Sequence, residues 1–297
     1  MNKHEFCCYI RRLATKALLY EVSVTPKPGL VDRYNSGAHR DMDFFTFLNS
    51  SLSLSDYFYI CAEQGINFNG DNYSDLLKSM RSIGIKAEKD MFNATEGVNT
   101  HRGLIFSIGI ISVAAGLHFK KYGKEYISAS EISDIVKLLA EDITVELNCI
   151  NPNKNLTYGE RLYLQYGVKG IRGEAEAGFE TVLVHSLPVL KSLLKEEKHI
   201  NDILVNILLH LIVNTEDSNI LGRHNSKILD YAKEKAENAL KHGGYFTTEG
   251  RLLVEEMDRC FIEKNISPGG SADLIAVTLM LYFIENGDNI KYNIGAR

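Results

Sequence analysis

Residues 97–116 read GVNTHRGLIFSIGIISVAAG, and this stretch decides the fold class. After its first seven residues, apolar side chains occupy nearly every side of a helix. A helix that is hydrophobic all round must be buried. The polar residues Asn99, Thr100, His101 and Arg102 come directly before this apolar run. We therefore expect their side chains to point into the protein interior or into a cleft.

The rest of the chain repeats a helical pattern. Apolar residues recur at spacings of three and four, and no series of short alternating runs with hairpin turns interrupts them. Only five prolines occur in 297 residues. The sequence predicts an all-α protein of about ten or more helices, in one domain over residues 1–297. The predicted helices are Phe6–Val24, Phe44–Ile66, Leu76–Phe92, Leu104–Phe119, Ile132–Ile150, Ala175–Leu194, Ile203–Val213, Ile228–Leu240, Leu252–Ile262 and Ala272–Ile284.

The composition is that of an ordinary soluble globular protein. Apolar residues make up 45% and charged residues 24%, and the net charge of −5 gives no general footprint for nucleic acid or membrane surfaces. No apolar run approaches the roughly 20 residues that span a bilayer, and the first residues lack the apolar core of a signal peptide. The five cysteines are scattered, without a disulfide framework or a zinc spacing. We expect a cytoplasmic protein and leave its oligomeric state open.

Four further polar segments accompany the apolar helices. The segments 170–178 (GIRGEAEAG) and 266–273 (ISPGGSAD) each open a predicted helix, and 214–219 (NTEDSN) follows an apolar one. The segment 21–43 (EVSVTPKPGLVDRYNSGAHRDMD) combines charges with prolines and glycines, which fix the direction of the backbone. A surface loop, a helix cap or a surface salt bridge explains each segment taken alone. Together they predict the walls of one central polar site.

The charged residues of these segments suit a magnesium–polyphosphate substrate. Magnesium takes one or two protein carboxylates together with phosphate oxygens, while basic groups and free N–H groups at helix starts offset the remaining charge. No P-loop, HExxH or GxSxG motif occurs, and the glycine run 167–173 follows no strand, which argues against dinucleotide binding. No nucleophilic cysteine or serine stands out, so direct displacement on a bound nucleotide is favoured. The candidate acids and cations are Glu21, Asp32, Asp41, Asp43, Glu174, Glu176, Asp217, Asp273, Lys27, His39, His101, Arg102, Arg172 and Arg223.

Six short motifs, in order along the chain, resemble the triphosphoribosyl-dephospho-coenzyme A synthase family. They are PKPGLVD (26–32), GAHRDMD (37–43), GVNTHRG (97–103), GIRGEAEAGF (170–179), EDSN (216–219) and SPGGSADL (267–274). The resemblance covers roughly residues 10 to 285 and implies a central nucleotide-binding cleft. It implies transfer of the triphosphoribosyl group of ATP to the ribose 2′-hydroxyl of 3′-dephospho-CoA, with release of adenine. The product is then the prosthetic-group precursor for the acyl carrier protein of citrate lyase or malonate decarboxylase, passed on by a downstream prosthetic-group transferase.

The resemblance also implies roles for residues within the motifs. The substrate- and phosphate-binding candidates are Lys27, Asn99, Thr100, His101, Arg102, Arg172, Arg223, Gly269, Gly270 and Ser271. The candidates for proton transfer or for stabilising an oxocarbenium-like transition state are His39, Asp32, Asp43 and Asp41. The candidates for Mg²⁺ ligation are Glu174 and Asp217, with Asp41 as a third choice. Two positions depart from the family pattern: Arg102 replaces a common lysine, and Arg223-His224-Asn225 lacks the glycine usual beside the arginine.

Two other functions fit parts of the same pattern. An all-helical, magnesium-dependent hydrolase of the ADP-ribosyl hydrolase kind cleaves a ribosyl bond with water, so its release of adenine needs no dephospho-CoA. A non-catalytic helical binding module docks a partner protein through its charged loops. Binding of ATP–magnesium that is sensitive to a change at His101 counts against the binding module.

Overall fold

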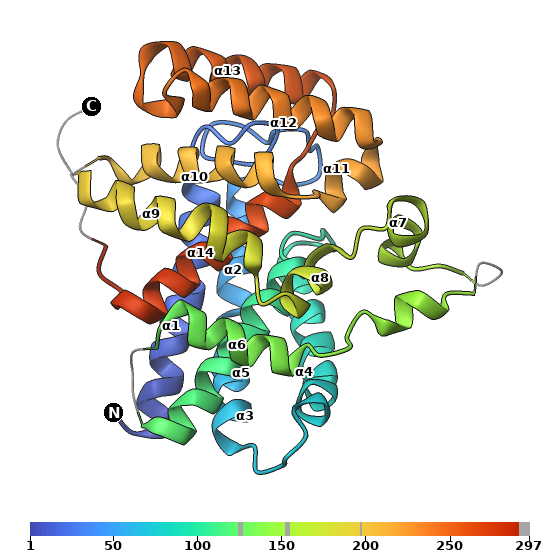
Figure 1. Ribbon diagram of the computed structural model, residues 1–297, viewed down its shortest axis with the longest axis vertical. Helices are drawn as coiled ribbons and strands as arrows, with labels where there is room; N and C mark the ends of the chain where they lie inside the picture. Colours follow the sequence, from blue (N-terminus) through green and yellow to red (C-terminus); the bar gives the residue numbers. More distant parts are fainter. Residues whose placement is uncertain (124–126, 152–154, 197, 291–297) are drawn as a thin grey trace.

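The computed structural model describes residues 1–123, 127–151, 155–196 and 198–290. In these residues the chain forms helices and helical turns but no β-strand, which confirms the all-α prediction (Figure 1). The α-helices are α1 (Lys3–Ser23), α2 (Phe44–Ser53), α3 (Ser55–Asn67), α4 (Tyr73–Ala94), α5 (Arg102–Tyr122), α6 (Ala129–Leu139), α7 (Tyr158–Tyr166), α8 (Gly170–Glu176), α9 (Leu187–Leu193), α10 (Ile200–Asn214), α11 (Ser218–Arg223), α12 (Ser226–Lys241), α13 (Thr248–Glu263) and α14 (Gly269–Asn286). The short 3₁₀ and π turns are η1 (Val145–Cys149), η2 (Val182–Ser186), η3 (Leu194–Glu196) and η4 (Gly244–Phe246).

The most apolar segments form the core, as their composition requires. Nearly all side chains of α5 from Leu104 to Phe119 and of α14 from Ser271 to Ile284 are buried. Each fully buried large aliphatic side chain contributes roughly 1.5–3 kcal/mol to folding. By length and composition α5 could cross a membrane, but 83% of its apolar window is buried inside the protein, as in the core helix of a soluble protein.

Helices α3 and α5 approach each other at backbone distance. A Cβ atom added to Gly116 would lie 2.1 Å from the Ala62 carbonyl oxygen, and one added to Gly65 would lie 2.2 Å from that of Val113. Only glycine fits at these two positions, because any side chain would separate the helices. This crossing fixes the position of α5, whose first turn carries the polar residues predicted to enter a cleft.

Three predicted helices are interrupted in the structure. The segment Phe44–Ile66 forms α2 and α3, which meet at Leu54. Serine hydroxyls bond to backbone carbonyls just before this break, as Ser53 does to Ser50 O at 2.8 Å, and such bonds compete with the helical ladder. In Ile132–Ile150 the helix ends at Leu139, and in Ala175–Leu194 it stops at Glu176.

The last two breaks have backbone causes. Asp142 has a φ of +60°, and Gly178 and Phe179 have φ values of +68° and +59°. An α-helix cannot continue through a residue in this left-handed region. Short segments of different direction therefore replace the longer helices that the apolar periodicity predicts.

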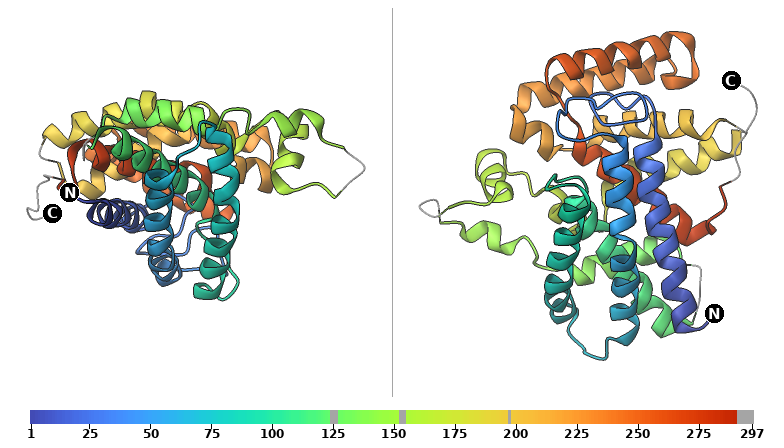
Figure 2. Two further views of the ribbon diagram at one scale, coloured as in Figure 1. Left: turned by 90° about the horizontal axis from the view of Figure 1, so that it is seen from below. Right: turned by 180° about the vertical axis from the view of Figure 1, so that it is seen from behind.

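The segment between α1 and α2 is folded back onto α13. Its Gly29 N–H donates to Asp258 Oδ1 at 2.9 Å, and a Cβ on Gly29 would collide with the carbonyl oxygen of Ile266. In Figure 1 this loop lies beneath α12 and α13, close to the start of α14. On the other side of the molecule, η1 and α7 project from the helical body, as both views of Figure 2 also show.

The α3–α5 crossing yields a stability prediction. We expect Gly116→Ala to lower the free energy of unfolding by about 2 kcal/mol, because overpacking a close contact costs that order of energy. Gly84→Ala is the matched control, since only the Tyr57 hydroxyl lies near its added Cβ, at 3.9 Å. There we expect a gain of about 0.5 kcal/mol from the lower entropy of the unfolded chain. Urea denaturation measures both, and equal effects would contradict the close crossing.

Candidate active site

A cavity of about 980 Å³ opens where the starts of α5 and α14 meet α7, α8 and α11. Segments from four of the polar clusters predicted from the sequence contribute to its wall. A smaller cavity of about 270 Å³ adjoins it and shares Gly173, Glu174 and Thr181. The polar and aromatic residues that line the larger cavity are Asn99, Arg102, Tyr158, Tyr166, Lys169, Glu174, Thr181, Asn214, Thr215, Glu216, Ser218, Asn219, Arg223 and Asp273.

Three cationic side chains line this cavity. Arg102 pairs with Glu88 at 2.6 Å, and Lys169 pairs with Glu176 at 2.8 Å. Arg223 donates to the Ala38 carbonyl oxygen at 3.4 Å. All three are largely exposed, so these bonds hold them weakly and leave donors available for an anion. The arrangement can therefore bind a phosphate chain.

Two carboxyl groups face the same cavity with little or no protein bonding. Glu174 Oε1 accepts a hydrogen bond from Thr181 Oγ1 at 2.7 Å, while its Oε2 is buried and has no hydrogen-bond partner among the described residues. Burial raises the pKa of Glu174, and the nearby Glu180 carboxylate adds to this shift. Burial and the carboxylates of Glu21 and Asp217 raise the pKa of Asp273 well above its usual range.

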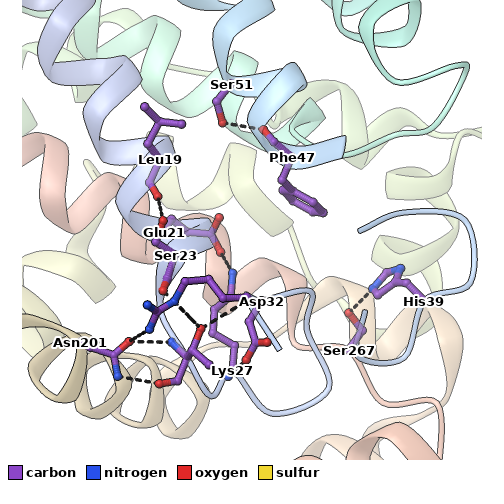
Figure 3. A network of polar contacts seen from close by, with 12 residues as sticks. Leu19, Glu21, Ser23, Lys27, Asp32, His39, Phe47, Ser51, Asn201 and Ser267 are labelled. Atoms are coloured by element: carbon purple, nitrogen blue, oxygen red, sulfur yellow. Dashed lines mark hydrogen bonds and ion pairs between the residues drawn. The ribbon is translucent and has the colours of Figure 1, made fainter. Parts of the chain in front are cut away.

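Beneath the cavity, the loop after α1 is built around buried charges. The Lys27 ammonium pairs with the Glu21 carboxylate, and both side chains are almost completely buried. The Lys27 backbone N–H donates to Asp32 Oδ2 at 3.0 Å, and the N–H groups of Tyr34 and Asn35 donate to Asp32 Oδ1 at 2.7 and 3.1 Å. Figure 3 shows Lys27 extended toward Glu21, with Asp32 beside it. These groups hold the loop in shape and do not line the cavity.

Asp217 joins two helix starts. Its Oδ1 accepts from the backbone N–H groups of Asn219 and Ile220 at 2.9 and 3.2 Å, which caps α11. Its Oδ2 accepts from the backbone N–H and the hydroxyl of Ser271 at 2.8 and 2.9 Å, at the start of α14. These four bonds use the four acceptor positions of a carboxylate, and the side chain is fully buried. The structure thus gives Asp217 and Ser271 a joining role, which differs from their predicted magnesium and substrate roles.

His101 lies at the start of α5 as a buried, neutral ring. Its Nδ1 shares a hydrogen bond of 2.7 Å with Ser50 Oγ, which also accepts from Thr100 Oγ1 at 2.7 Å. Its Nε2 is buried without a hydrogen-bond partner among the described residues. Burial and the positive charge of Lys27 lower the pKa of His101 to about 3. The ring is therefore uncharged at neutral pH and does not serve as a cation.

His39 is held beside the cavity and not inside it. Its Nε2 bonds to Ser267 Oγ at 2.9 Å, and the Arg223 guanidinium lies 3.4 Å from its Nδ1. Burial and this guanidinium lower the pKa of His39 to about 4. Asp41 and Asp43 are exposed, and Asp43 caps α2 by accepting from the Thr46 N–H at 2.9 Å. Their carboxylates do not line the cavity.

The structure therefore divides the predicted site residues into two groups. Those that line the larger cavity are Asn99, Arg102, Glu174, Arg223 and Gly270. Those that do not line it are Lys27, Asp32, His39, Asp41, Asp43, Thr100, His101, Arg172, Asp217, Gly269 and Ser271. Arg172 pairs with Glu146 at the surface, so its predicted phosphate contact stays a prediction.

Several residues that line the cavity have no role assigned from the sequence, and Lys169, Tyr158, Tyr166 and Asp273 are the ones used below. Lys169 lies within the glycine run 167–173, which matches no dinucleotide motif, and Tyr158 and Tyr166 begin and end the helix before it. The two glycines around Lys169 are the sequence signal that could have pointed to it. Gly167 and Gly170 have φ values of +71° and +59°, so the chain turns sharply on both sides of this lysine. Asp273 is one of the candidate acids, but the sequence assigns it no site role. An acid in the first turn of a helix is explained by its favourable interaction with the helix dipole alone.

Comparison with known proteins gives a consistent result. A family model described as ATP:dephospho-CoA triphosphoribosyl transferase matches residues 7–292. A Lactiplantibacillus plantarum protein named probable 2-(5''-triphosphoribosyl)-3'-dephosphocoenzyme-A synthase is 39% identical over 273 residues, covering 90% of this chain and 94% of that protein. Proteins of the same name from Vibrio cholerae (39% identity, 92% of this chain and 87% of the relative) and Streptococcus pyogenes (38%, 93% and 96%) are also similar. No solved structure matches the chain.

The bonds of Asp217 yield a second stability prediction. We expect Asp217→Ala to lower the free energy of unfolding by about 3 kcal/mol, because it removes a cap and leaves buried donors at two helix starts unpaired. Glu216→Ala is the neighbouring control: its carboxylate bonds to Lys233 at 2.6 Å but is mostly exposed, so a change of about 0.5 kcal/mol is expected. Chemical denaturation of both variants checks this, and equal losses would contradict the joining role.

The buried ring of His101 yields a pH prediction. Its pKa is about 3 in the folded protein and 6.5 in the reference state, so the unfolded chain binds the extra proton between these values. The stabilisation that this histidine gives at pH 7 is therefore lost as the pH falls below about 6.5, by up to about 1.4 kcal/mol per pH unit. We expect His101→Gln to remove this part of the slope. Denaturation curves of wild type and variant from pH 7 to pH 5 test it, and parallel slopes would contradict it.

Proposed function

Because the chain belongs to the ATP:dephospho-CoA triphosphoribosyl transferase family, we propose that it transfers the triphosphoribosyl group of ATP to the ribose 2′-hydroxyl of 3′-dephospho-CoA and releases adenine. The protein is an ATP-using transferase, as the family match and the names of its relatives indicate. One observation carries the assignment of the reaction to the larger cavity: the same wall presents exposed cations and unbonded carboxyl groups.

The phosphate chain of ATP needs the cations. In our proposal Arg102, Lys169 and Arg223 bind the triphosphate, and an arginine at position 102 provides a fixed fork of N–H donors. The first turn of α14 adds backbone N–H groups near Gly270, which favour an anion at a helix start. Lys27 and His101, which do not line the cavity, support the shape of its surroundings without direct contact.

The ribosyl carbon needs the carboxyl groups. Breaking the bond between ribose and adenine passes through an oxocarbenium-like state, which a nearby carboxylate stabilises. The tyrosine rings at 158 and 166 offer flat surfaces against which adenine can stack. Water must be kept from the anomeric carbon, because it would compete with the acceptor hydroxyl. The adjoining smaller cavity extends the site beyond Glu174, where the acceptor can enter.

We propose that Mg²⁺ enters with ATP, and the residues present fit it in part. Glu174 Oε2 is a carboxyl oxygen that no described residue bonds, as a ligand position requires. Asp217 does not fit, since its acceptor positions are already used. No three His, Cys, Asp or Glu side chains converge into a metal cluster within the described ranges. This suits a metal held chiefly by phosphate oxygens and water, where it offsets phosphate charge.

We further propose that the product supplies the prosthetic group of an acyl carrier protein, that of citrate lyase or of malonate decarboxylase. A prosthetic-group transferase would then be a transient downstream partner. A cytoplasmic location agrees with the cysteines, which are all free thiols. The hydrolase alternative differs in one observable respect, because adenine would then appear from ATP without dephospho-CoA.

The reaction itself is directly testable. After incubation with ATP, Mg²⁺ and dephospho-CoA, we expect mass spectrometry to detect triphosphoribosyl-dephospho-CoA together with free adenine. Glu174→Gln should lower the turnover by about 100-fold, the typical effect of removing one electrostatic partner of a reacting group. Glu237→Gln, on the exposed face of α12 and paired with Lys241, is the control and should keep wild-type activity. Adenine release that does not depend on dephospho-CoA would identify a hydrolase instead.

A further inference from the structure

The Asp273 carboxyl stands apart from the other inward-pointing aspartates of this protein. Asp32 and Asp217 accept backbone N–H donors, and Asp258 accepts from the Gly29 N–H at 2.9 Å and from Asn35 Nδ2 at 3.2 Å. Asp273 is half-buried at the wall of the larger cavity, and no hydrogen bond to its carboxyl is found among the described residues. A carboxylate with restricted access to water and without such donors is costly.

The surroundings of Asp273 favour its neutral form. Two carboxylates, those of Glu21 and Asp217, lie close enough to repel a negative charge on it. The cation in reach, Lys27, is already engaged by Glu21. A carboxyl group in such surroundings keeps its proton, and a neutral carboxyl is a hydrogen-bond donor and an acid.

The backbone of α5 places this carboxyl at the cavity wall. A Cβ added to Gly103 would lie 1.9 Å from Asp273 Oδ2, so the carboxyl occupies the space that a side chain at position 103 would fill. The absence of a side chain there brings the first turns of α5 and α14 together. Asp273 is thereby held between two helix starts and faces the space where the nucleotide is proposed to bind.

We propose that Asp273 is the general acid that protonates the departing adenine, an inference that rests on the proposed transferase function. The Asp273 O–H bond breaks, and its proton passes to a ring nitrogen of adenine. The bond from the anomeric carbon to adenine breaks, and its electron pair stays on the purine. The acceptor oxygen forms the new bond to the anomeric carbon and loses its proton, which restores the Asp273 proton through solvent.

A substrate whose leaving group needs no proton tests this role. 7-Methyl-ATP carries a positively charged purine, which departs as a neutral base without an acid. We expect Asp273→Asn to slow the reaction of ATP by about 100-fold or more, the usual contribution of a general acid, while 7-methyl-ATP reacts within about threefold of the wild-type rate. Equal slowing of both substrates would overturn the proposal, because it would indicate a role in binding or in oxocarbenium stabilisation. Wild-type rates with ATP would overturn it as well.

Two further variants keep the test decisive. Gly103→Ala forces the Asp273 carboxyl to move, and it should reproduce the selective loss with ATP while the greater helix propensity of alanine preserves folding. Asp288→Asn, beyond the other end of α14 in an ion pair with Arg12 at 2.9 Å, is the control and should leave both rates unchanged. A Gly103→Ala enzyme of wild-type activity would count against the placement of the acid. Failure of the wild-type enzyme with both nucleotides would instead reject the proposed function.

Discussion

The buried carboxylate of Asp217 is the interaction on which the arrangement of the cavity depends. It bonds to backbone N–H groups at the starts of α11 and α14, two segments far apart in sequence. Helix starts carry unpaired donors and partial positive charge, so one buried carboxylate satisfies both. Because α14 is fixed at Ser271, the Asp273 carboxyl two residues later lies beside Gly103 of α5. The same carboxylate thus stabilises the fold and orients the cavity wall.

The charged groups of this region separate into two physical classes. The Lys27–Glu21 pair and the carboxylate of Asp32 are buried and fully bonded, and they define the loop between α1 and α2. Within the described part of the chain, Glu174 Oε2 is buried without a hydrogen-bond partner, and the Asp273 carboxyl faces the cavity with no hydrogen bond found to it. Unbonded polar groups are tolerated in a folded protein where a ligand completes them. This contrast, rather than the mere presence of charge, is the reason why we propose that Glu174 and Asp273 meet a substrate.

The sequence predicted the buried helices, because continuous apolar runs such as 104–116 allow only an interior position. Of the five polar segments, four contribute to the cavity wall and 21–43 does not. The sequence could not separate Asp217 from Asp273. Both lie at or near the start of a helix, and their roles differ through the neighbours that the fold supplies. It also missed Lys169, since a lysine between glycines carries no apolar periodicity. The break at Leu54 was hidden because apolar spacing continues across it.

The chemistry of the proposed reaction explains why one wall carries both kinds of charge. A triphosphate requires cations, whereas the ribosyl carbon gains positive charge as adenine leaves and requires carboxylates. If the buried histidines were protonated, they would add positive charge behind the carboxyl groups and oppose the second requirement. Burial keeps His39 and His101 neutral, and the nearby cations Arg223 and Lys27 add to this effect. The cations that face the cavity are therefore Arg102, Arg223 and Lys169, and in the proposed reaction the carboxyl groups act on the sugar and the base.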